Sequence, residues 1–266
     1  MQRICTAILC TVFCLLFVTP QAAADVLEDI LDRRVIRIGV AEFVPWTMRS
    51  KSGELIGFEI DVARKLAADM GVRADIRVYE LNDIIPAVQQ GEIDVIAGGL
   101  AITPRRALQV SFSRPLASTG ISVAVNGEKL RNVSSLEHLD DERVVIAAVS
   151  DTLALNVSQT FFPDAEIRVF ETAAEAETEL LENRAHAYLA SEPEVDFLAM
   201  QSGGRIEVPI AEPMMASAEG LAVRRGEQEL LNFLDAWVVA RQTDKWLVAA
   251  RNYWFKSIDW AAELAE

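Results

Sequence analysis

Apolar segments with strand character alternate with segments of helical periodicity along most of this chain, and this order limits the fold more than any other feature. The first such set contains "VIRIGV", "ADIRVYE" and "IDVIAGGL" as strands, with two helices between them. The first helix places apolar residues at helical spacing from Ile60 to Met70 and stops at Gly71, and the second stops at Gly91. Alternation of this kind predicts an α/β fold, in which a mostly parallel sheet carries helices on both faces.

A second set of the same kind begins after Asn126 and Gly127. It reads as strands at 143–150, 165–170 and 186–191, with helices at 151–162 and 172–185. Thr172 and Glu175 have the spacing of a capping box at the start of the second helix. A last strand and a long amphipathic helix follow from residue 219. Two α/β sets in one chain predict two lobes.

The first 24 residues have the pattern of a secretory signal peptide. Arg3 precedes an apolar run from residue 7 to 18, then Pro20 and a small-residue stretch ending at Ala24. The apolar run is too short for a typical transmembrane helix. We therefore expect export, cleavage near Ala24 and no direct insertion into the membrane.

The cysteines and the charge exclude several kinds of site and partner. Cys5, Cys10 and Cys14 all lie inside the expected signal peptide, so we expect a mature chain without disulfides, a thiol nucleophile or a lipid anchor. His138 and His186 are far apart in sequence, so we expect no metal site, and no cofactor motif is present. A formal net charge of −15 disfavours nucleic acid as a partner, so any anion site must come from local geometry.

The stretch "GGLAITPRRALQV" is the strongest candidate for such a site. Thr103 is a good N-cap and Pro104 suits the first helical position, so a helix should begin just past the carboxyl end of a strand. Ligands bind at such strand ends in open α/β sheets, and an inward arginine would match a carboxylate. The alternative is that Arg105 and Arg106 are both solvated on the first turn.

The chain also resembles a known family over nearly its whole mature length. The segments that carry the resemblance are "GFEIDVARKLAADMG", "IIPAVQQGEIDVIAGGLAITPRRALQVSFSRP", "EGLAVRRG" and "DKWLVAARNYWF". They are similar to the family 3 extracytoplasmic solute-binding proteins, the polar amino-acid receptors of ABC importers. The resemblance implies the type II periplasmic-binding-protein fold, with two lobes that each contain a mixed, mostly parallel sheet flanked by helices. Lobe 1 would comprise residues 25–122 plus 220–266 and lobe 2 residues 123–219, joined by hinge strands in "GISVAVNG" and "EGLAVRRG".

The resemblance also implies a set of ligand-binding residues. Arg106 would hold a ligand carboxylate, whereas Arg105 would be solvated. The other positions that correspond to the family's site in the first lobe are Phe43 and Trp46 as an aromatic lid, Leu81 as an apolar wall, Gly98 as backbone at the ligand, and Ala101 in place of a hydroxyl residue.

The second lobe departs from the family pattern. Thr152 is retained, but Ser191 stands where the family has the aspartate that holds the ligand's α-ammonium. Because a buried ammonium needs an anionic partner, either Glu192 or Glu194 replaces that aspartate, or the ligand lacks a free α-ammonium. From the residues alone, both glutamates are expected to lie solvated in a loop around Pro193.

We therefore expect a monomeric periplasmic binding protein without enzymatic activity, which closes its hinge on a small carboxylate such as an amino acid and is recognised by an inner-membrane ABC permease. Two alternatives stay open. One is an enzyme resembling periplasmic cyclohexadienyl dehydratases, which act on prephenate or arogenate, with Glu194 or Glu192 as its general acid. The other is a ligand receptor for a sensor kinase.

Overall fold

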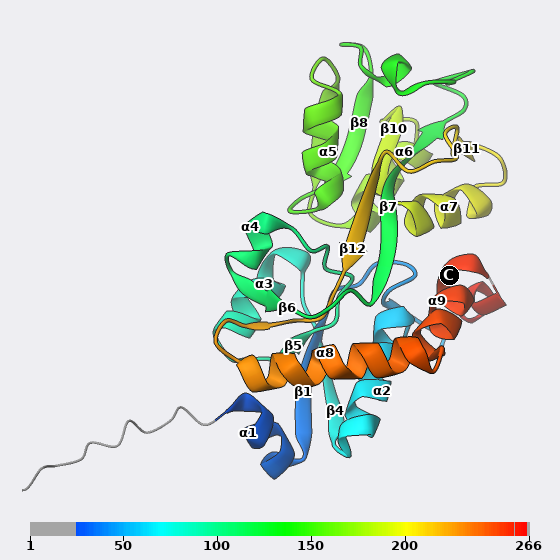
Figure 1. The fold of residues 1–266 in the computed structure, drawn as a ribbon. Helices are drawn as coiled ribbons and strands as arrows, with labels where there is room; N and C mark the ends of the chain where they lie inside the picture. The colour runs from blue at the N-terminus through cyan, green and yellow to red at the C-terminus, as the bar shows by residue number, and fades with distance from the viewer. Residues whose placement is uncertain (1–24, 258, 265–266) are drawn as a thin grey trace, which may run out of the picture.

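The computed structural model describes residues 25–257 and 259–264, which form two lobes stacked end to end (Figure 1). The expected signal peptide and its three cysteines lie outside the described residues. Within the described part of the chain, no helix is long and apolar enough to cross a membrane. We call the N-terminal body the first lobe and the body that contains β8 to β11 the second lobe.

The first lobe is built on a mixed sheet in the strand order β4-β1-β5-β13-β6. Strand β1 is parallel to β4 and β5, whereas β13 is antiparallel to β5 and β6. The bounds of these strands are β1 Val35–Val40, β4 Arg73–Val78, β5 Val95–Ile96, β6 Val110–Phe112 and β13 Ala222–Arg224. The antiparallel β13 returns to this lobe after the chain has passed through the second, so the first lobe is discontinuous in sequence.

Helices and a small hairpin complete the first lobe. The helices are α1 Val26–Arg33, α2 Phe58–Met70, α3 Leu81–Gln89, α4 Pro104–Ala107, α8 Gln228–Thr243 and α9 Trp246–Lys256, and the hairpin pairs β2 Met48–Arg49 with β3 Leu55–Ile56. As predicted, α2 stops at Gly71, which adopts the left-handed conformation. The strand predicted in "IDVIAGGL" is shorter than expected because the chain turns at Gly99, whose φ is 60°.

The second lobe has a mixed sheet in the order β11-β7-β10-β8-β9, with β12 also paired to β7. Its strands are β7 Ala117–Asn126, β8 Val145–Val149, β9 Glu166–Phe170, β10 Ala187–Ser191, β11 Ile206–Glu207 and β12 Met215–Glu219. Its helices are η1 Leu136–Leu139, α5 Leu153–Phe161, α6 Ala173–Leu181 and α7 Glu192–Gln201. The predicted capping box of Thr172 and Glu175 is present at the start of α6.

The loop predicted around Pro193 is wrong, because this stretch is the first turn of α7. Ser191 occupies the N-cap position in an extended conformation, and the proline falls in the first turn, where its missing N–H costs no helical hydrogen bond. The helix therefore begins directly at the end of β10. Consequently Glu192 and Glu194 have fixed directions relative to that strand.

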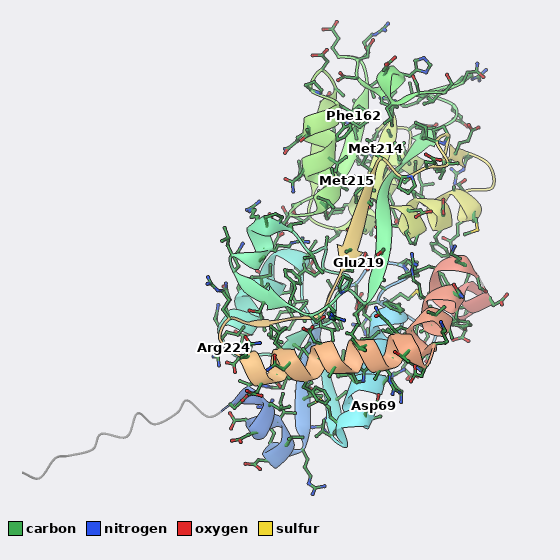
Figure 2. The ribbon with its side chains drawn as sticks, in the orientation of Figure 1. Asp69, Phe162, Met214, Met215, Glu219 and Arg224 are labelled. Carbon is green, nitrogen blue, oxygen red and sulfur yellow. The ribbon has the colours of Figure 1, made fainter. Side chains whose placement is uncertain are left out.

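Two antiparallel strands, β7 and β12, connect the lobes (Figures 1 and 2). Their register pairs Met215 with Ile121 and Glu219 with Ala117. The second connecting strand is thus 215–219, which shares only Glu219 with the predicted segment "EGLAVRRG". The rest of that segment enters the first lobe as β13, because Gly220 and Leu221 lead directly into the sheet.

The C-terminal segment η2, Asp259–Glu263, lies against both lobes. Trp260 is 1% exposed and stacks on Phe197 of α7, with 4.9 Å between ring centroids. Its other neighbour is Trp254 of α9, at 5.6 Å. The aromatic cluster thus links the end of the first lobe to the helix that carries Glu194.

Candidate functional site

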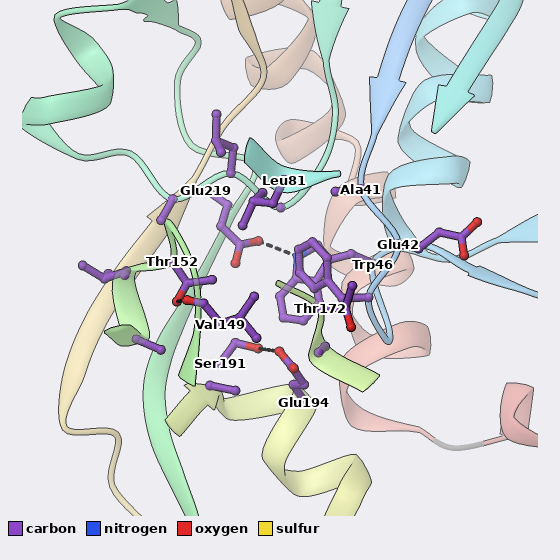
Figure 3. A pocket seen from close by; sticks show the side chains of 18 of the residues that line it. Ala41, Glu42, Trp46, Leu81, Val149, Thr152, Thr172, Ser191, Glu194 and Glu219 are labelled. Atoms are coloured by element: carbon purple, nitrogen blue, oxygen red, sulfur yellow. Dashed lines mark hydrogen bonds between the residues drawn. The ribbon is translucent and has the colours of Figure 1, made fainter. Parts of the chain in front are cut away.

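A cavity of about 500 Å³ lies between the two lobes and is lined by both. Figure 3 draws many of its side chains, with Glu219 and Trp46 on one side and Ser191 and Glu194 on the other. Of the sequence-predicted site residues, the cavity brings together Phe43, Trp46, Leu81, Ala101, Arg106, Thr152, Ser191 and Glu194. Gly98 and Glu192 do not line it.

Arg106 reaches across the cavity mouth from the first lobe to the second. Its backbone N–H donates to the Thr103 hydroxyl at 3.2 Å, which fixes the start of α4. Its guanidinium donates to the carbonyl oxygen of Ala101 at 3.1 Å and to that of Asp151 at 2.6 Å. Burial lowers the pKa of Arg106. Both acceptors are neutral carbonyls, and the nearby charge of Asp151 favours the charged form of the guanidinium without an ion pair to it among the described residues, so this half-buried group can pair with an anion.

Arg105 differs from its neighbour, as expected from the sequence. Its side chain is 75% exposed, and its nearest acid, Asp151, is 3.9 Å away at the outer edge. The helix predicted here is only the single turn Pro104–Ala107. So short a helix has little macrodipole, and the anion-binding character of the region rests on the Arg106 side chain.

Phe43 and Trp46 form an aromatic wall on the first lobe. Their ring centroids are 5.0 Å apart. Trp46 is fully buried from solvent, packs on Phe255 at 4.9 Å, and donates its indole N–H to Glu219 at 2.7 Å. This tryptophan is therefore both a core residue and a wall of the cavity, whereas Phe43 is only partly buried.

The glycine that reaches the cavity is Gly99 and not Gly98. A side chain on Gly98 would meet the backbone of Ala41 and the side chain of Ile84, away from the cavity. At Gly99 the first side-chain atom would lie within 3 Å of the rings of Phe43 and Trp46, so only glycine fits beside the aromatic wall. The sequence contains Gly98 and Gly99 side by side and did not indicate which of the two would face the cavity.

Two hydroxyl residues of the second lobe have local partners. Thr152 is the N-cap of α5, where its side chain accepts from the Leu155 N–H at 3.1 Å and donates to the Val149 carbonyl at 2.7 Å. Ser191 donates to a carboxylate oxygen of Glu194 at 3.3 Å. Thr152 thus mainly shapes the chain, whereas Ser191 orients an acid.

The expectation that both glutamates of α7 are solvated is wrong for Glu194, which is 7% exposed. Its carboxylate accepts hydrogen bonds from the hydroxyls of Tyr188 and Ser191. Burial raises the pKa of Glu194 to about 7. Glu194 is the third residue of α7, and its side chain turns back towards the N-cap residue Ser191. Because α7 begins at the edge of the cavity, this direction brings the carboxyl of Glu194 into the cavity lining.

Two further buried carboxyls lie beside the aromatic wall and were not identified from the sequence. Glu219 accepts from Trp46 and from Thr119, at 2.7 and 3.1 Å. Glu59 accepts from the Gly99 N–H at 3.0 Å. The sequence did contain a signal that Glu59 is buried. Its neighbours on α2 are mostly apolar, and such a pattern indicates a helix turn that has no solvent-exposed face.

These buried carboxyls make stability depend on pH. Burial, with the nearby charge of Glu219, raises the pKa of Glu59 to about 8, and burial raises that of Glu219 to about 7. The folded state then binds more protons than the unfolded state between pH 5 and 8, so the free energy of unfolding falls as pH rises through this window. We expect a loss on the order of a few kcal/mol, measured by thermal unfolding at pH 5 and pH 8.

A Glu59→Gln variant is the control for this pH dependence. It retains an acceptor for the Gly99 N–H but cannot ionise, so its melting temperature should fall less between pH 5 and 8 than that of the wild type. A wild-type melting temperature that is constant or rises over this range would contradict the assignment.

Comparison with known proteins gives consistent matches. The family model described as "Bacterial extracellular solute-binding proteins, family 3" matches residues 36–257. The "Probable amino-acid ABC transporter periplasmic-binding protein y4tE" of Sinorhizobium fredii is 30% identical over 206 residues, which are 75% of this chain and 68% of that protein. The L-cystine-binding protein TcyJ of Escherichia coli K12 is 22% identical over 238 residues, 88% of this chain and 87% of TcyJ.

Solved structures match over most of both chains. An ancestral amino acid-binding protein, AncCDT-1, described as a precursor of cyclohexadienyl dehydratase, is 30% identical with a TM-score of 0.80, covering 87% of this chain and all of that one. An ancestral arginine-binding protein bound to glutamine is 26% identical with a TM-score of 0.77, covering 85% of this chain and 99% of that one.

Proposed function

Because the chain belongs to the family 3 bacterial extracellular solute-binding proteins, we propose that it is the amino-acid-binding component of an ABC transporter. The predicted type II periplasmic-binding-protein fold is confirmed by the match to AncCDT-1. The observation that carries the proposal is Arg106, a half-buried cation at the cavity whose guanidinium, within the described residues, donates its hydrogen bonds to neutral carbonyls. An amino acid supplies the carboxylate that this guanidinium can bind in a bidentate manner.

Ligand binding and lobe closure are coupled in this proposal. A ligand that contacts both lobes only when they are shut shifts the equilibrium towards the closed form by its difference in affinity. Contacts between the lobes assist closure: Asn82 donates to Ser150 at 3.1 Å and to Glu171 at 2.9 Å, and Arg106 donates to Asp151. The strands β7 and β12 would serve as the hinge, since they connect the lobes.

The partner and the compartment follow from the same proposal. The named relatives include periplasmic-binding proteins of ABC transporters, so we propose that an inner-membrane permease receives the closed form and that the chain acts in the periplasm. We propose cleavage of the signal peptide near Ala24. Transport is favoured over presentation to a sensor kinase because the relatives are named as transport components.

The named curated relatives are binding proteins and not enzymes. The dehydratase alternative requires a buried carboxylic acid, which Glu194 would supply, and one similar structure is described as a precursor of such an enzyme. We propose no catalytic role for Glu194. Prephenate belongs in the ligand panel, because its conversion to phenylpyruvate would overturn the binding-protein assignment.

A thermal-shift screen of residues 25–266, refolded to remove bound ligand, tests this function. The panel comprises amino acids, their deaminated and N-acetylated derivatives, dicarboxylates and prephenate. A ligand present at 100 times its Kd stabilises the folded chain by about 2.7 kcal/mol. For a chain of this size that is a shift of roughly 5–10 °C. The absence of any shift with every carboxylate would contradict the proposal.

A further inference from the structure

Phe197 is an apolar residue of the second lobe whose side chain is buried by the first lobe. It lies on α7, where Val195 and Leu198 face the core of the second lobe. Phe197 instead belongs to the hydrophobic cluster of the first lobe and is 7% exposed. Its ring stacks on Trp260 of η2, with an angle of 29° between the ring planes. The burial of Phe197 therefore depends on how the two lobes are placed relative to each other.

The segment that carries Trp260 is fixed to the first lobe. In the turn between β2 and β3, the backbone N–H of Lys51 donates to the Glu263 carbonyl at 2.8 Å. On its other side, Trp260 packs on Trp254, whose indole N–H donates to Asp61 of α2 at 2.8 Å. The segment is thus part of the first lobe, and its contact with α7 is a contact between the lobes.

This contact is made by the packing of rings. Within the described residues, the indole N–H of Trp260 is buried without a hydrogen-bond partner, so no directional bond holds this side chain in place. A stacked aromatic pair is stabilised by apolar burial and by ring–ring attraction, and both are lost when the rings separate. The pair therefore favours this arrangement of the lobes over any arrangement that separates the rings.

The contact lies near the cavity but outside its lining. Neither Phe197 nor Trp260 lines the cavity, whereas Glu194, one helical turn before Phe197, does. In the view of Figure 1, the C-terminal end of the chain lies beside α7 on one side of β7 and β12, and α4 and α5 lie on the other. Arg106 of α4 donates to Asp151 on that other side. Contacts between the lobes thus flank the connecting strands on both sides.

We propose that Phe197 and Trp260 form a latch, which holds the lobes in the closed arrangement and increases the affinity for the ligand without contacting it. Its effect on affinity rests on the proposed function, in which the ligand binds as the lobes close. The affinity of a ligand falls with the fraction of the chain in the binding-competent form. A latch that favours this form raises the affinity for every ligand by the same factor, so Phe197 and Trp260 are positioning residues.

Trp260→Ala tests the latch by isothermal titration calorimetry with L-lysine, L-arginine and L-glutamine. For each amino acid that binds the wild type, we expect the affinity to fall roughly 10-fold, the factor that corresponds to the loss of an aromatic pair. The factor should be the same for these ligands, and stopped-flow measurement should find most of it in faster dissociation. Trp260→Phe keeps a stacked ring and loses no hydrogen bond, so its affinity should stay within about 3-fold of the wild type.

The matched control is Trp246→Ala, which removes a tryptophan from an aromatic pair inside the first lobe. Trp246 of α9 packs against Trp237 of α8, with 6.2 Å between the ring centroids. This variant should lower the melting temperature of the unliganded chain, yet leave Kd within about 2-fold, because distant sites act independently. Equal losses of affinity in Trp246→Ala and Trp260→Ala would show a general effect of destabilisation and overturn the latch.

A double-mutant cycle with Phe197→Ala separates the latch from a displacement of Glu194. If the two rings act through one contact, the chain carrying both Phe197→Ala and Trp260→Ala should bind about as weakly as either single variant. Circular dichroism verifies that each variant is folded. Losses of affinity that add up would show that the two residues act through other neighbours, and the latch would be wrong.

Scattering from the unliganded chain tests the latch without any ligand. Small-angle X-ray scattering should give a larger radius of gyration for Trp260→Ala than for the wild type, because more of the chain is open, while Trp260→Phe keeps the wild-type value. An unchanged radius of gyration in Trp260→Ala would overturn the latch even if amino acids bind. If the radius increases but no carboxylate of the ligand panel binds the wild type, the latch stands and the proposed function fails.

Discussion

Replacing Arg106 with alanine is expected to weaken amino-acid binding by at least about 25-fold without unfolding the chain. Removing one partner of a desolvated charge pair costs about 2–5 kcal/mol, and each 1.4 kcal/mol is a factor of ten in Kd. The side chain also donates to Ala101 and Asp151, so the variant loses one contact between the lobes as well. Isothermal titration of wild type and variant with the same amino acid measures the effect.

Arg105→Ala is the matched control, because it removes the same charge one residue away. That side chain is 75% exposed and does not line the cavity, so its loss should change Kd less than 3-fold. If both variants lose affinity equally, the loss comes from the change in the net charge of the chain and not from the position of Arg106 in the cavity. If neither does, the carboxylate binds elsewhere.

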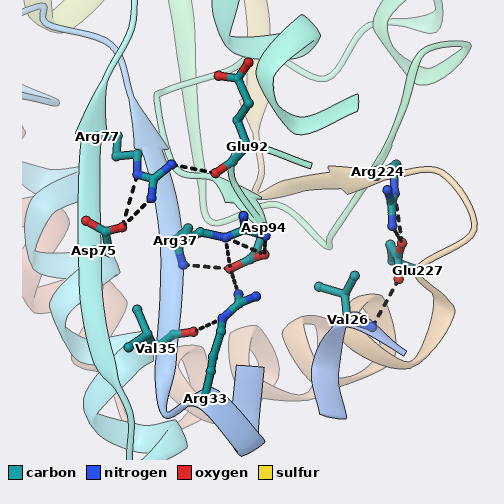
Figure 4. A network of polar contacts seen from close by, with 10 residues as sticks. All are labelled: Val26, Arg33, Val35, Arg37, Asp75, Arg77, Glu92, Asp94, Arg224 and Glu227. Atoms are coloured by element: carbon teal, nitrogen blue, oxygen red, sulfur yellow. Dashed lines mark hydrogen bonds and ion pairs between the residues drawn. The ribbon is translucent and has the colours of Figure 1, made fainter. Parts of the chain in front are cut away.

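Replacing Asp94 with alanine is expected to lower the free energy of unfolding by about 3 kcal/mol, near the lower end of the range for a broken buried ion pair. Figure 4 shows the network around this acid, whose side chain is 1% exposed. Its carboxylate accepts from the backbone and guanidinium of Arg37, at 2.7 and 2.6 Å, and from Arg33 of α1. The loss should lower the melting temperature by roughly 6–12 °C, measured by thermal unfolding.

Asp75→Ala is the control for this network, because Asp75 pairs with Arg77 on the neighbouring strand β4 (Figure 4). Both of these side chains are exposed by a third or more, and such pairs contribute at most about 1 kcal/mol. A smaller effect for Asp94→Ala than for Asp75→Ala would contradict the view that Asp94 joins β1, β5 and α1. Ligand affinity should be unchanged in both variants, since neither acid lines the cavity.

The sequence predicted the order of helices and strands because the deciding signals are local. The apolar run 35–40 became β1 with those bounds, and the capping box at Thr172 begins α6. Local signals failed where neighbouring segments decide the outcome. The second connecting strand, 215–219, pairs with a strand almost a hundred residues earlier, and nothing in "MASAE" alone indicates such pairing.

The acids of the site were the least predictable part, because burial is set by the whole fold. Arg106 and the aromatic residues came from the family resemblance, and the structure places them around one cavity. Glu219 ends the stretch "MMASAE", whose small and apolar residues give no sign that the acid is buried, yet it lies 4% exposed under Trp46. Glu194 was expected in solvent because Pro193 suggested a loop, although a proline at a helix start is equally compatible with α7.

The most direct test of the account compares an α-amino acid with its carboxamide, which keeps the ammonium but removes the anion that Arg106 is proposed to bind. The measurement is the Kd of the ligand-stripped chain for L-lysine, L-arginine and L-glutamine and for the α-amide of each. We predict that at least one amino acid binds and that its α-amide binds at least 100-fold more weakly. An α-amide that binds as tightly as its amino acid would show that the cavity does not hold its ligand by a carboxylate at Arg106.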